Sequence, residues 1–482
     1  MNLILDAFES VCQRKPDHLA SAGQALALDY KSLRAAACGL SGQIAARAKA
    51  RNVGVLTPTS AAGTAATLAC WYAGKTPVPL NFLLAPEELG RVIKDAGLDL
   101  VLTIEFFAPM LAAAGVPLLL LNAQSLGPGR ATPPEARSDD TAVIIYTSGT
   151  TGDCKGACLS FANIARNALA CVEYARIDHN QVFLNVLPQF HAFGFTTMTV
   201  LPLMIGASVW TLPKFTPLSI ASTIAEKKIT IFIAIASMYA ALVKLKDVEP
   251  TSLKTLTLAI AGGEPLPRNV ERAFAAKFGV ELMEGYGMTE ASPVVSVNVP
   301  WANRPGSVGR TLPGVEVWAA DEAGTKLPPG SDGELVIGGI GVMQGYFNRA
   351  DATGTVLRGG RMHSGDIGHV DDDGFVHITG RAKEMIIVGG ENVFPREIEE
   401  ALTQHSAVAE AAVIGVKDPL RGELPVAFVV LQPDRMVDAN ELRAFCRERL
   451  AGYKTPREVR ILPEMPRGPT GKVLKKSLGA LL

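Results

Sequence analysis

The stretch Tyr146-Thr-Ser-Gly-Thr-Thr-Gly-Asp-Cys-Lys-Gly156 directly follows an apolar run, Ala142-Val-Ile-Ile145. The apolar run predicts a buried β-strand. A strand that opens into glycines, hydroxyls and a lysine presents backbone N–H groups to whatever lies above it, and such an arrangement suits phosphate. The stretch lacks the Gly-Lys pair of the P-loop, so it predicts a different phosphate loop. An ordinary surface turn is the alternative interpretation, because Gly, Ser and Thr also cluster there.

The chain has 482 residues and a formal net charge of -1. This length exceeds what one hydrophobic core usually serves, and it predicts several packed units. Because the charges nearly cancel, nothing favours nucleic acid or an anionic membrane as a partner. The balance favours a small-molecule substrate and no nucleic acid.

The seven cysteines are scattered, without a C-x-x-C pair or a histidine at metal spacing. They favour a reducing cytoplasm and no zinc site. The first residues, Met-Asn-Leu-Ile-Leu-Asp, lack the basic and apolar regions of a signal peptide. The apolar stretch 231–243 is too short to span a bilayer, and Pro202 interrupts the longer stretch 193–212. We therefore expect a cytoplasmic protein without a transmembrane segment, with peripheral membrane contact left open.

Alanine-rich helical patterns alternate with short apolar runs from residue 1 to about 140 and again from 160 to 285. Strands separated by helices indicate βαβ units on mostly parallel sheets. The sequence thus predicts an α/β fold with two doubly wound layers over residues 1–305. The expected helices are 31–46, 60–73 and 86–96, and the expected strands are 53–56, 76–80, 98–102, 117–121, 182–187, 208–212, 231–234 and 257–260.

The texture of the chain changes near Gly306. From 306 to 370, short strands separated by glycine and proline turns predict a small β-rich unit. After Gly380-Arg-Ala-Lys383, helical patterns at 395–405 and 439–450 and strands near 408–416 and 424–431 predict a smaller α+β domain. We expect an N-terminal domain over 1–382 and a C-terminal domain over 383–482.

Four further stretches carry chemical groups. Ala259-Ile-Ala-Gly-Gly-Glu-Pro265 ends a strand in two glycines, which let a flat ring approach the backbone. Glu284-Gly-Tyr-Gly-Met-Thr-Glu290 adds an aromatic ring, a hydroxyl and a carboxylate. His363-Ser-Gly-Asp366 with Gly380-Arg381 offers an acceptor for vicinal hydroxyls and a cation. Pro466-Arg-Gly-Pro-Thr-Gly-Lys472 is basic and glycine-rich. Each stretch alone is also typical of structural turns.

Taken together and in this order, these stretches resemble the adenylate-forming ligases, which include acyl-CoA synthetases, firefly-luciferase-like enzymes and the adenylation domains of peptide synthetases. The resemblance covers roughly residues 10 to 475. Leu187-Pro-Gln-Phe-His-Ala-Phe-Gly194 and Ser292-Pro-Val-Val-Ser-Val-Asn-Val-Pro300 are locally most similar to the ligase part of bacterial acyl-acyl-carrier-protein synthetases.

This resemblance implies an ATP-dependent acid–thiol ligase. A carboxylate attacks the α-phosphate of ATP, pyrophosphate leaves, and a thiol of CoA or of carrier-protein phosphopantetheine opens the mixed anhydride. The resemblance also implies a mobile C-terminal domain that rotates about a hinge at Lys383. Catalysis is then expected to consist of positioning and charge neutralisation.

The resemblance assigns roles to particular residues. The departing phosphates are held by Thr147, Ser148, Gly149, Thr150, Thr151, Gly152 and Lys155, and Mg²⁺ by Thr150 and Glu290. The adenosine is held by Gly262, Gly263, Glu264, Tyr286, Gly287, Asp366 and Arg381. Thr289 contacts the α-phosphate, Lys472 meets the carboxylate and the bridging oxygen, and Gly390 lines the passage for the thiol. Cys154 stands where the family usually has proline, which puts the rigidity of the loop in doubt.

His191 narrows the substrate. In amino-acid-activating relatives the residue after the matching aromatic is an aspartate that pairs with the α-amine, whereas here Phe190 is followed by histidine. An α-amino acid is therefore disfavoured. The apolar surroundings at 192–197 and 233–238 and at Met288 suit an acyl or aryl tail, with a medium- or long-chain fatty acid as the first expectation. The alternative is that these residues are simply core.

Other functions stay open at this point. A fatty acyl-AMP ligase that serves only a carrier protein is the nearest alternative, followed by an aryl-acid CoA ligase. A catalytically silent nucleotide or acyl sensor is the alternative from another class. Intact Lys155, Glu290, Asp366, Arg381 and Lys472 argue against it.

Overall fold

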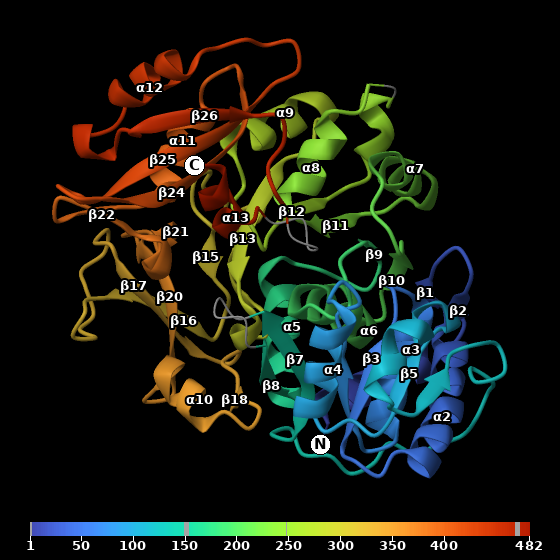
Figure 1. Cartoon of the computed structure of the whole chain (residues 1–482). Helices are drawn as coiled ribbons and strands as arrows, with labels where there is room; N and C mark the ends of the chain where they lie inside the picture. Colours follow the sequence, from blue (N-terminus) through green and yellow to red (C-terminus); the bar gives the residue numbers. More distant parts are fainter. Residues whose placement is uncertain (1, 149–153, 247, 468–472) are drawn as a thin grey trace.

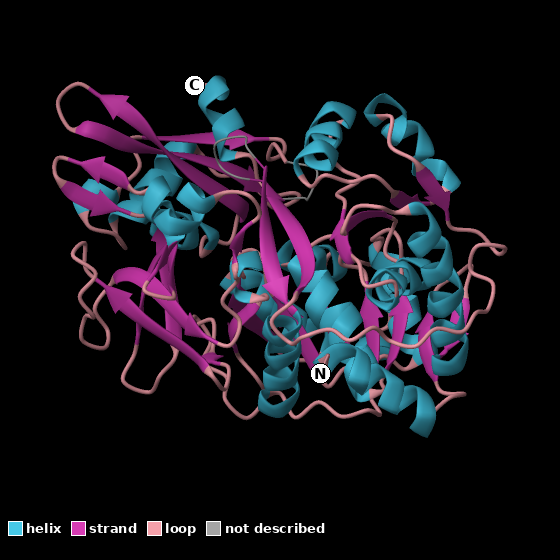
Figure 2. Ribbon diagram, turned by 90° about the horizontal axis from the view of Figure 1, so that it is seen from below, coloured by secondary structure: helices cyan, strands magenta, loops and turns pink. Residues whose placement is uncertain are grey.

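The structure, a computed structural model, describes residues 2–148, 154–246, 248–467 and 473–482 (Figure 1). Figure 2 shows long strands and a group of helices at the left of the molecule, and many helices with shorter strands between them at the right. Among the described helices, none has the length and apolarity needed to cross a membrane.

The largest sheet has nine strands, in the order β15-β14-β13-β12-β11-β9-β10-β1-β2. Strands from β13 to β1 pair in parallel, whereas β14, β15 and β2 are antiparallel additions at the two edges. These strands are β1 (Leu19–Ala22), β2 (Ala27–Asp29), β9 (Val182–Asn185), β10 (Ser208–Thr211), β11 (Ile231–Ala234), β12 (Leu258–Ala261), β13 (Leu282–Gly287), β14 (Val294–Val297) and β15 (Arg310–Thr311). The connecting helices are α5 (Phe161–Tyr174), α6 (Leu201–Ile205), α7 (Pro217–Lys227), α8 (Ala236–Val243) and α9 (Arg268–Phe278).

A second, parallel sheet has the order β4-β3-β5-β6. It comprises β3 (Asn52–Leu56), β4 (Thr76–Pro79), β5 (Val101–Thr103) and β6 (Leu118–Leu120), with helices α1 (Leu3–Arg14), α2 (Tyr30–Arg47), α3 (Ala61–Tyr72) and α4 (Pro86–Asp95) nearby. Every residue of β4 is buried, as expected for a strand covered on both faces. The predicted helices and strands of this half are thus confirmed, with boundaries shifted by one to three residues.

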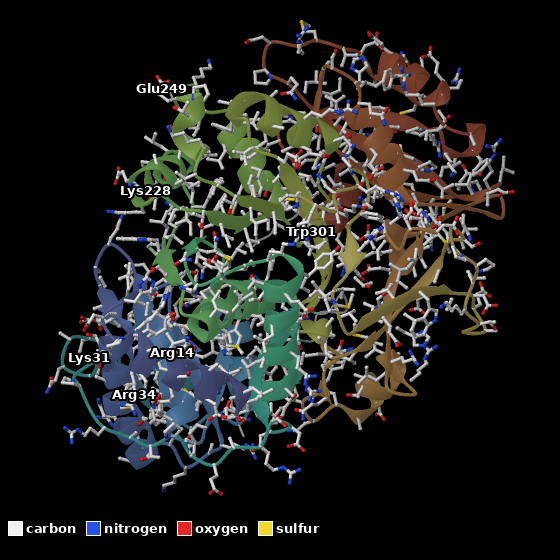
Figure 3. All side chains as sticks on the ribbon, turned by 180° about the vertical axis from the view of Figure 1, so that it is seen from behind. Arg14, Lys31, Arg34, Lys228, Glu249 and Trp301 are labelled. Carbon is white, nitrogen blue, oxygen red and sulfur yellow. The ribbon has the colours of Figure 1, made fainter. Side chains whose placement is uncertain are left out.

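The N-terminal helices are tied together by a polar contact as well as by apolar packing. Arg34 on α2 lies 2.8 Å from the Glu9 carboxylate on α1, and the Tyr72 hydroxyl on α3 also donates to Glu9. Figure 3 shows Arg34 among these helices on the rear of the molecule. Trp71 on α3 donates its indole N–H to the Ala142 carbonyl at 2.8 Å, which anchors the strand that leads into the phosphate-loop sequence.

That strand belongs to a separate antiparallel sheet of order β18-β8-β7. Its members are β7 (Thr141–Ser148), β8 (Cys154–Ser160) and the short β18 (Gly345–Tyr346). The chain thus returns from the loop as a second strand, β8. β18 pairs with β8 through Gly345 opposite Cys158 and Tyr346 opposite Ala157, although it lies within the stretch expected to form the β-rich unit.

The β-rich unit is an antiparallel sheet of β16 (Val315–Ala320), β17 (Gly333–Gly339), β19 (Leu357–Arg358), β20 (Arg361–Val370) and β21 (Val376–Arg381), with α10 (Ala350–Val356) beside it. It extends beyond residue 370, because β21 pairs with β20. The acidic run after Val370 forms the hairpin turn between β20 and β21, and its Asp371 and Asp373 pair with Arg304 at 2.5 and 2.6 Å.

The small C-terminal domain has one mixed sheet. It contains β22 (Ile386–Val388), β23 (Glu391–Val393), β24 (Val408–Asp418), β25 (Gly422–Leu431) and β26 (Glu458–Leu462), together with α11 (Pro395–Thr403), α12 (Ala439–Arg447) and α13 (Lys475–Leu478). In Figure 1 this domain sits above the β-rich unit and beside the β13 end of the largest sheet. The predicted α+β domain is therefore present.

Candidate active site

The β7–β8 hairpin places Thr147 opposite Lys155, near the loop that the sequence singled out. The Thr147 hydroxyl donates to the Lys155 carbonyl at 3.4 Å. Ser148 ends β7, while Gly149, Thr150, Thr151 and Gly152 lie outside the described residues.

Glu290 lies next to this hairpin, in a short 3-10 helix over Thr289–Ala291. Its carboxylate accepts a hydrogen bond from the Tyr346 hydroxyl at 2.7 Å, and the Lys155 ammonium lies 5.3 Å from the centre of the Tyr346 ring. The structure thus brings Lys155 and Glu290 together, although 135 residues separate them in the sequence, through a tyrosine that the sequence analysis did not single out. Tyr346 reaches this place because β18 pairs with β8.

A second cluster joins Tyr286, Asp366 and Arg381. The Tyr286 hydroxyl donates to one Asp366 oxygen at 2.6 Å, and Arg381 Nε lies 3.0 Å from the other. Asp366 is 3% exposed, while Arg381 is 60% exposed at the end of β21. Burial raises the pKa of Asp366, partly offset by the Arg381 charge, and burial together with Asp366 raises the pKa of Tyr286 well above its usual range. A carboxylate held by a phenol and a guanidinium is a fixed hydrogen-bond acceptor.

The double glycine after β12 forms a tight turn beside this cluster. Gly263 has a backbone φ of +80°, which residues other than glycine rarely adopt. A Cβ on Gly262 would lie 2.9 Å from the Phe193 ring, and a Cβ on Gly263 would lie 3.8 Å from Ile235 Cγ2. Glu264 accepts from the Ser237 N–H at 2.5 Å, which fixes the turn against the start of α8.

His191 precedes a π-helix over Phe193–Val200 and is half-buried. Its ring lies 4.6 Å from that of Phe190, measured between centroids. Phe190 in turn meets Phe82 edge-on at 5.1 Å, and Phe82 stacks on Phe107 at 5.0 Å. The His191 ring therefore lies at the end of a row of aromatic contacts that runs through Phe190 and Phe82.

The remaining predicted residues lie in the small domain and at its start. Lys383 lies in the 3-10 turn Ala382–Glu384 that follows β21, so it stands where the two domains join. Gly390 lies in the exposed turn between β22 and β23 with φ +92°. Lys472 lies outside the described residues.

The described residues near Glu290 suit Mg²⁺ better than a metal ion that is held by three or more protein side chains. Among the described residues, no group of three or more His, Cys, Asp or Glu side chains is placed to hold a metal ion. Mg²⁺ keeps several waters and commonly binds through one or two carboxylates together with substrate phosphates, so Glu290 beside the β7–β8 hairpin fits it.

Residues 8–347 match the family of AMP-binding enzymes, and residues 397–472 match the AMP-binding enzyme C-terminal domain. The chain belongs to the AMP-binding enzyme family. This AMP-binding enzyme is 36% identical to a feruloyl-CoA synthase of Amycolatopsis sp over 88% of its own length and 87% of that protein. It is 38% identical to a long-chain-fatty-acid–CoA ligase of Bacillus subtilis (strain 168), over 70% of this chain and 61% of that protein.

Solved structures extend the likeness to the arrangement of domains. ATP-bound MatB from Rhodopseudomonas palustris matches over 100% of this chain and 99% of that chain, with 31% identity and a TM-score of 0.92. The apo form of the same protein matches with a TM-score of 0.84. The o-succinylbenzoate CoA synthetase MenE from Bacillus subtilis, in complex with ATP and magnesium ion, covers 98% of this chain and 99% of that chain with 29% identity and a TM-score of 0.88.

These likenesses confirm the predicted superfamily and fold, with a large N-terminal and a small C-terminal domain. They show this AMP-binding enzyme to be an AMP-forming CoA ligase. ATP and magnesium ion are bound in the solved MenE structure.

Proposed function

We propose that this AMP-binding enzyme joins an apolar carboxylic acid to CoA through an acyl-adenylate. The observation that carries the proposal is the apolar surface beside the double glycine, where Phe193 packs on Gly262 and Ile235 on Gly263. Apolar walls with few polar groups bind a hydrocarbon tail by removing its surface from water.

The two polar clusters supply the nucleotide site in this proposal. Asp366, held by Tyr286 and Arg381, accepts the ribose hydroxyls, while the adenine ring lies between Tyr286 and the backbone of Gly262 to Glu264. Tyr286 suits this role because its hydroxyl is already engaged by Asp366, which leaves the face of the ring for stacking.

The phosphates then extend toward the β7–β8 loop. Lys155 and the hydroxyls of the loop neutralise the departing pyrophosphate, Thr289 contacts the α-phosphate, and Glu290 with Thr150 holds Mg²⁺. When bound, Mg²⁺ would neutralise charge on the phosphate oxygens. The Tyr346 hydroxyl holds one Glu290 oxygen, so the other oxygen keeps a defined direction. Lys472 balances charge on the carboxylate and the bridging oxygen as the anhydride forms.

Two classes of acid, which differ in their tail, are candidates for the substrate. A medium- or long-chain fatty acid is the first, because the side chains next to the double glycine, Phe193 and Ile235, are aromatic and aliphatic. An aryl acid is the second, supported by the feruloyl-CoA synthase relative, which matches almost end to end. CoA is the proposed acceptor, and a carrier-protein phosphopantetheine is the alternative.

A panel of acids tests the proposal. Pyrophosphate release with ATP and Mg²⁺ is measured for octanoate, palmitate, ferulate, benzoate, malonate and phenylalanine, at equal concentration. We expect a fatty acid or an aryl acid to exceed malonate and phenylalanine by at least about tenfold, roughly 1.4 kcal/mol in the barrier. A best rate with malonate or an amino acid would refute the apolar site. Repeating the best reaction with CoA and with a phosphopantetheinylated carrier protein decides the acceptor.

A further inference from the structure

Asp366 lies in a bulge of β20, beside the neighbouring strand β17 (Figure 1). The register between the two strands shifts between Glu334 and Val336, so that residues 364–366 of β20 lie opposite a single residue of β17. Bulges re-aim side chains and are common beside active sites. Here the bulge carries the carboxylate that the tyrosine and arginine of the second cluster hold, so its shape decides where that carboxylate stands.

Gly365 lies at the centre of the bulge with a backbone φ of +71°. Among the described residues, apart from its two chain neighbours, no heavy atom lies within 4 Å of the place that a Cβ on Gly365 would take. Packing on that side therefore does not hold the turn. Because glycine has more backbone freedom than other residues, the conformation at this position depends on its hydrogen bonds.

The Glu334 carboxylate on β17 contacts the bulge through both of its oxygens. Oε1 accepts from the Gly365 N–H at 3.1 Å, and Oε2 lies 2.8 Å from His363 Nδ1. The side chains of Glu334 and His363 are 30% and 13% exposed. An exposed ion pair alone contributes little, whereas a carboxylate that also accepts from a backbone N–H forms a stronger bond than a neutral acceptor would. Glu334 thus fixes the main chain directly before Asp366.

The next residue of β17 holds the bulge as well, but through its backbone. The Ser364 hydroxyl donates to the Leu335 carbonyl at 2.6 Å and accepts from the Asp366 N–H at 3.0 Å. Any residue at position 335 could supply that carbonyl. The contacts of Glu334 depend on its side chain, so Glu334 is the residue of β17 whose replacement would release the bulge.

We propose that Glu334 is a positioning residue for Asp366, which it serves by fixing the bulge from which Asp366 reaches the nucleotide. This inference rests on the proposed function, in which Asp366 accepts the ribose hydroxyls. A small displacement of a positioned group is expensive in rate. Loss of the Glu334 carboxylate should therefore weaken the contact with the ribose hydroxyls and leave the contacts with the phosphates in place.

A nucleotide without ribose hydroxyls tests this inference on the full chain. Pyrophosphate release is measured with CoA and the best acid of the panel, using ATP or 2′,3′-dideoxy-ATP, and the ratio of the two kcat/KM values gives the preference for ATP. We expect a wild-type preference of at least about a hundredfold, because a site built to bind hydroxyls rejects an analogue that lacks them.

Glu334→Ala should lower this preference by about tenfold or more, while kcat/KM for dideoxy-ATP stays within about threefold of wild type. A variant that is merely less well folded would lose activity with both nucleotides and keep the preference. Glu334→Gln, whose amide oxygen can still accept from the Gly365 N–H, should recover most of the preference. If Glu334→Ala does not fold, Glu334→Asp takes its place, since its shorter side chain draws the carboxylate back from the bulge, and a smaller loss is expected.

Asp332→Ala is the matched control. Asp332 Oδ1 lies 2.7 Å from His369 Nδ1, so this variant removes another carboxylate–histidine contact with β20, beyond the bulge. It should keep the wild-type preference. In an Asp366→Asn background, Glu334→Ala should lower the preference no further, because the two residues act on one contact.

The outcomes separate the inference from the proposed function. A wild-type preference that survives the Glu334 substitutions, an equal loss of preference in Asp332→Ala, or a further loss in the Asp366→Asn background would overturn the inference alone. A wild-type chain that uses ATP and dideoxy-ATP equally well would refute the ribose role of Asp366, and the inference with it.

Discussion

At the scale of single residues, Glu290 offers a direct test of the proposed metal site. Glu290→Gln keeps the shape of the side chain and removes its charge. We expect Mg²⁺-dependent pyrophosphate release to fall at least about tenfold, because metal coordination is electrostatic and direct. Tyr346→Phe, which removes only the hydroxyl that donates to Glu290, should cost less. Unchanged kinetics of Glu290→Gln at saturating Mg²⁺ would remove this residue from the metal site.

Asp366 gives a second prediction at this scale. In Asp366→Asn the amide cannot accept from both a ribose hydroxyl and Arg381 as a carboxylate does, so we expect the KM for ATP to rise by about tenfold while kcat changes less. ATP titrations at saturating acid measure it. Tyr286→Phe is the matched control, because it keeps the ring and removes the hydroxyl bond to Asp366. A fall in kcat at constant KM would place Asp366 elsewhere in the reaction.

The sequence could identify Asp366 and Arg381, but it could not identify Tyr346, which contacts both Lys155 and Glu290. Asp366 and Arg381 stand in a glycine-flanked pattern that suggested a ribose site, and the structure places them 3.0 Å apart. Tyr346 carried no such signal, because a lone Gly-Tyr pair is common and its role depends on β18 reaching a strand far away in the sequence. Local patterns report local structure, and pairing at long range does not leave a local pattern.

At the scale of elements, periodicity predicted most of the parallel strands and the helices α2, α3, α4, α11 and α12, because buried strands such as β11 and amphipathic helices such as α4 leave distinct patterns. The hairpin of β7 and β8 was not predicted, since Cys154–Ser160 has neither a continuous apolar run nor strict alternation. β13 was interpreted from its chemical groups alone, as its two glycines weaken the strand pattern.

β13 and α11 meet through an ion pair that predicts a pH dependence. Glu284 on β13 lies 4.0 Å from Arg396 on α11, and burial raises the pKa of Glu284 to about 7, with Arg396 opposing that rise. A carboxyl with a raised folded-state pKa stabilises the fold fully below its unfolded pKa, and this contribution is lost as pH rises through about 7. We therefore expect the urea midpoint of the wild type to fall between pH 5 and pH 8.

Glu284→Gln cannot titrate, so its midpoint should fall less over the same range, and the difference between the two chains at pH 8 should reach about 1–3 kcal/mol. Glu281→Gln, at an exposed carboxylate just before β13, is the control and should follow the wild type. Equal slopes for wild type and Glu284→Gln would show that Glu284 does not govern the dependence.

At the scale of the whole molecule, two regions of the small C-terminal domain are expected to serve different halves of the reaction. Lys472→Ala should abolish adenylate formation while a supplied acyl-adenylate is still converted to thioester, because a cation is needed only while pyrophosphate leaves. Gly390→Leu should do the reverse by filling the passage for the thiol. Since Gly390 has φ +92°, Gly390→Ala is the control that imposes the same backbone strain with little added volume.

This prediction is tested by measuring adenylate formation and thioester formation separately for each variant. Equal impairment of the two halves by Lys472→Ala and Gly390→Leu would argue against alternation of the domains. Lys383→Pro should slow the passage from one half-reaction to the other by stiffening the junction, without abolishing either half.

The pairing of β18 with β8 also dictates an order of assembly. Tyr346 lies opposite Ala157, so almost two hundred residues must be synthesised after β8 before its outer edge is covered. Until then β8 presents a row of free N–H and C=O groups, the kind of edge that invites pairing with another chain. Contacts so distant in sequence form slowly. A nascent chain or fragment that stops before residue 345 would thus be prone to aggregate. It would also lack Asp366 and Arg381 of the proposed ribose site, so nucleotide binding should appear only late in synthesis.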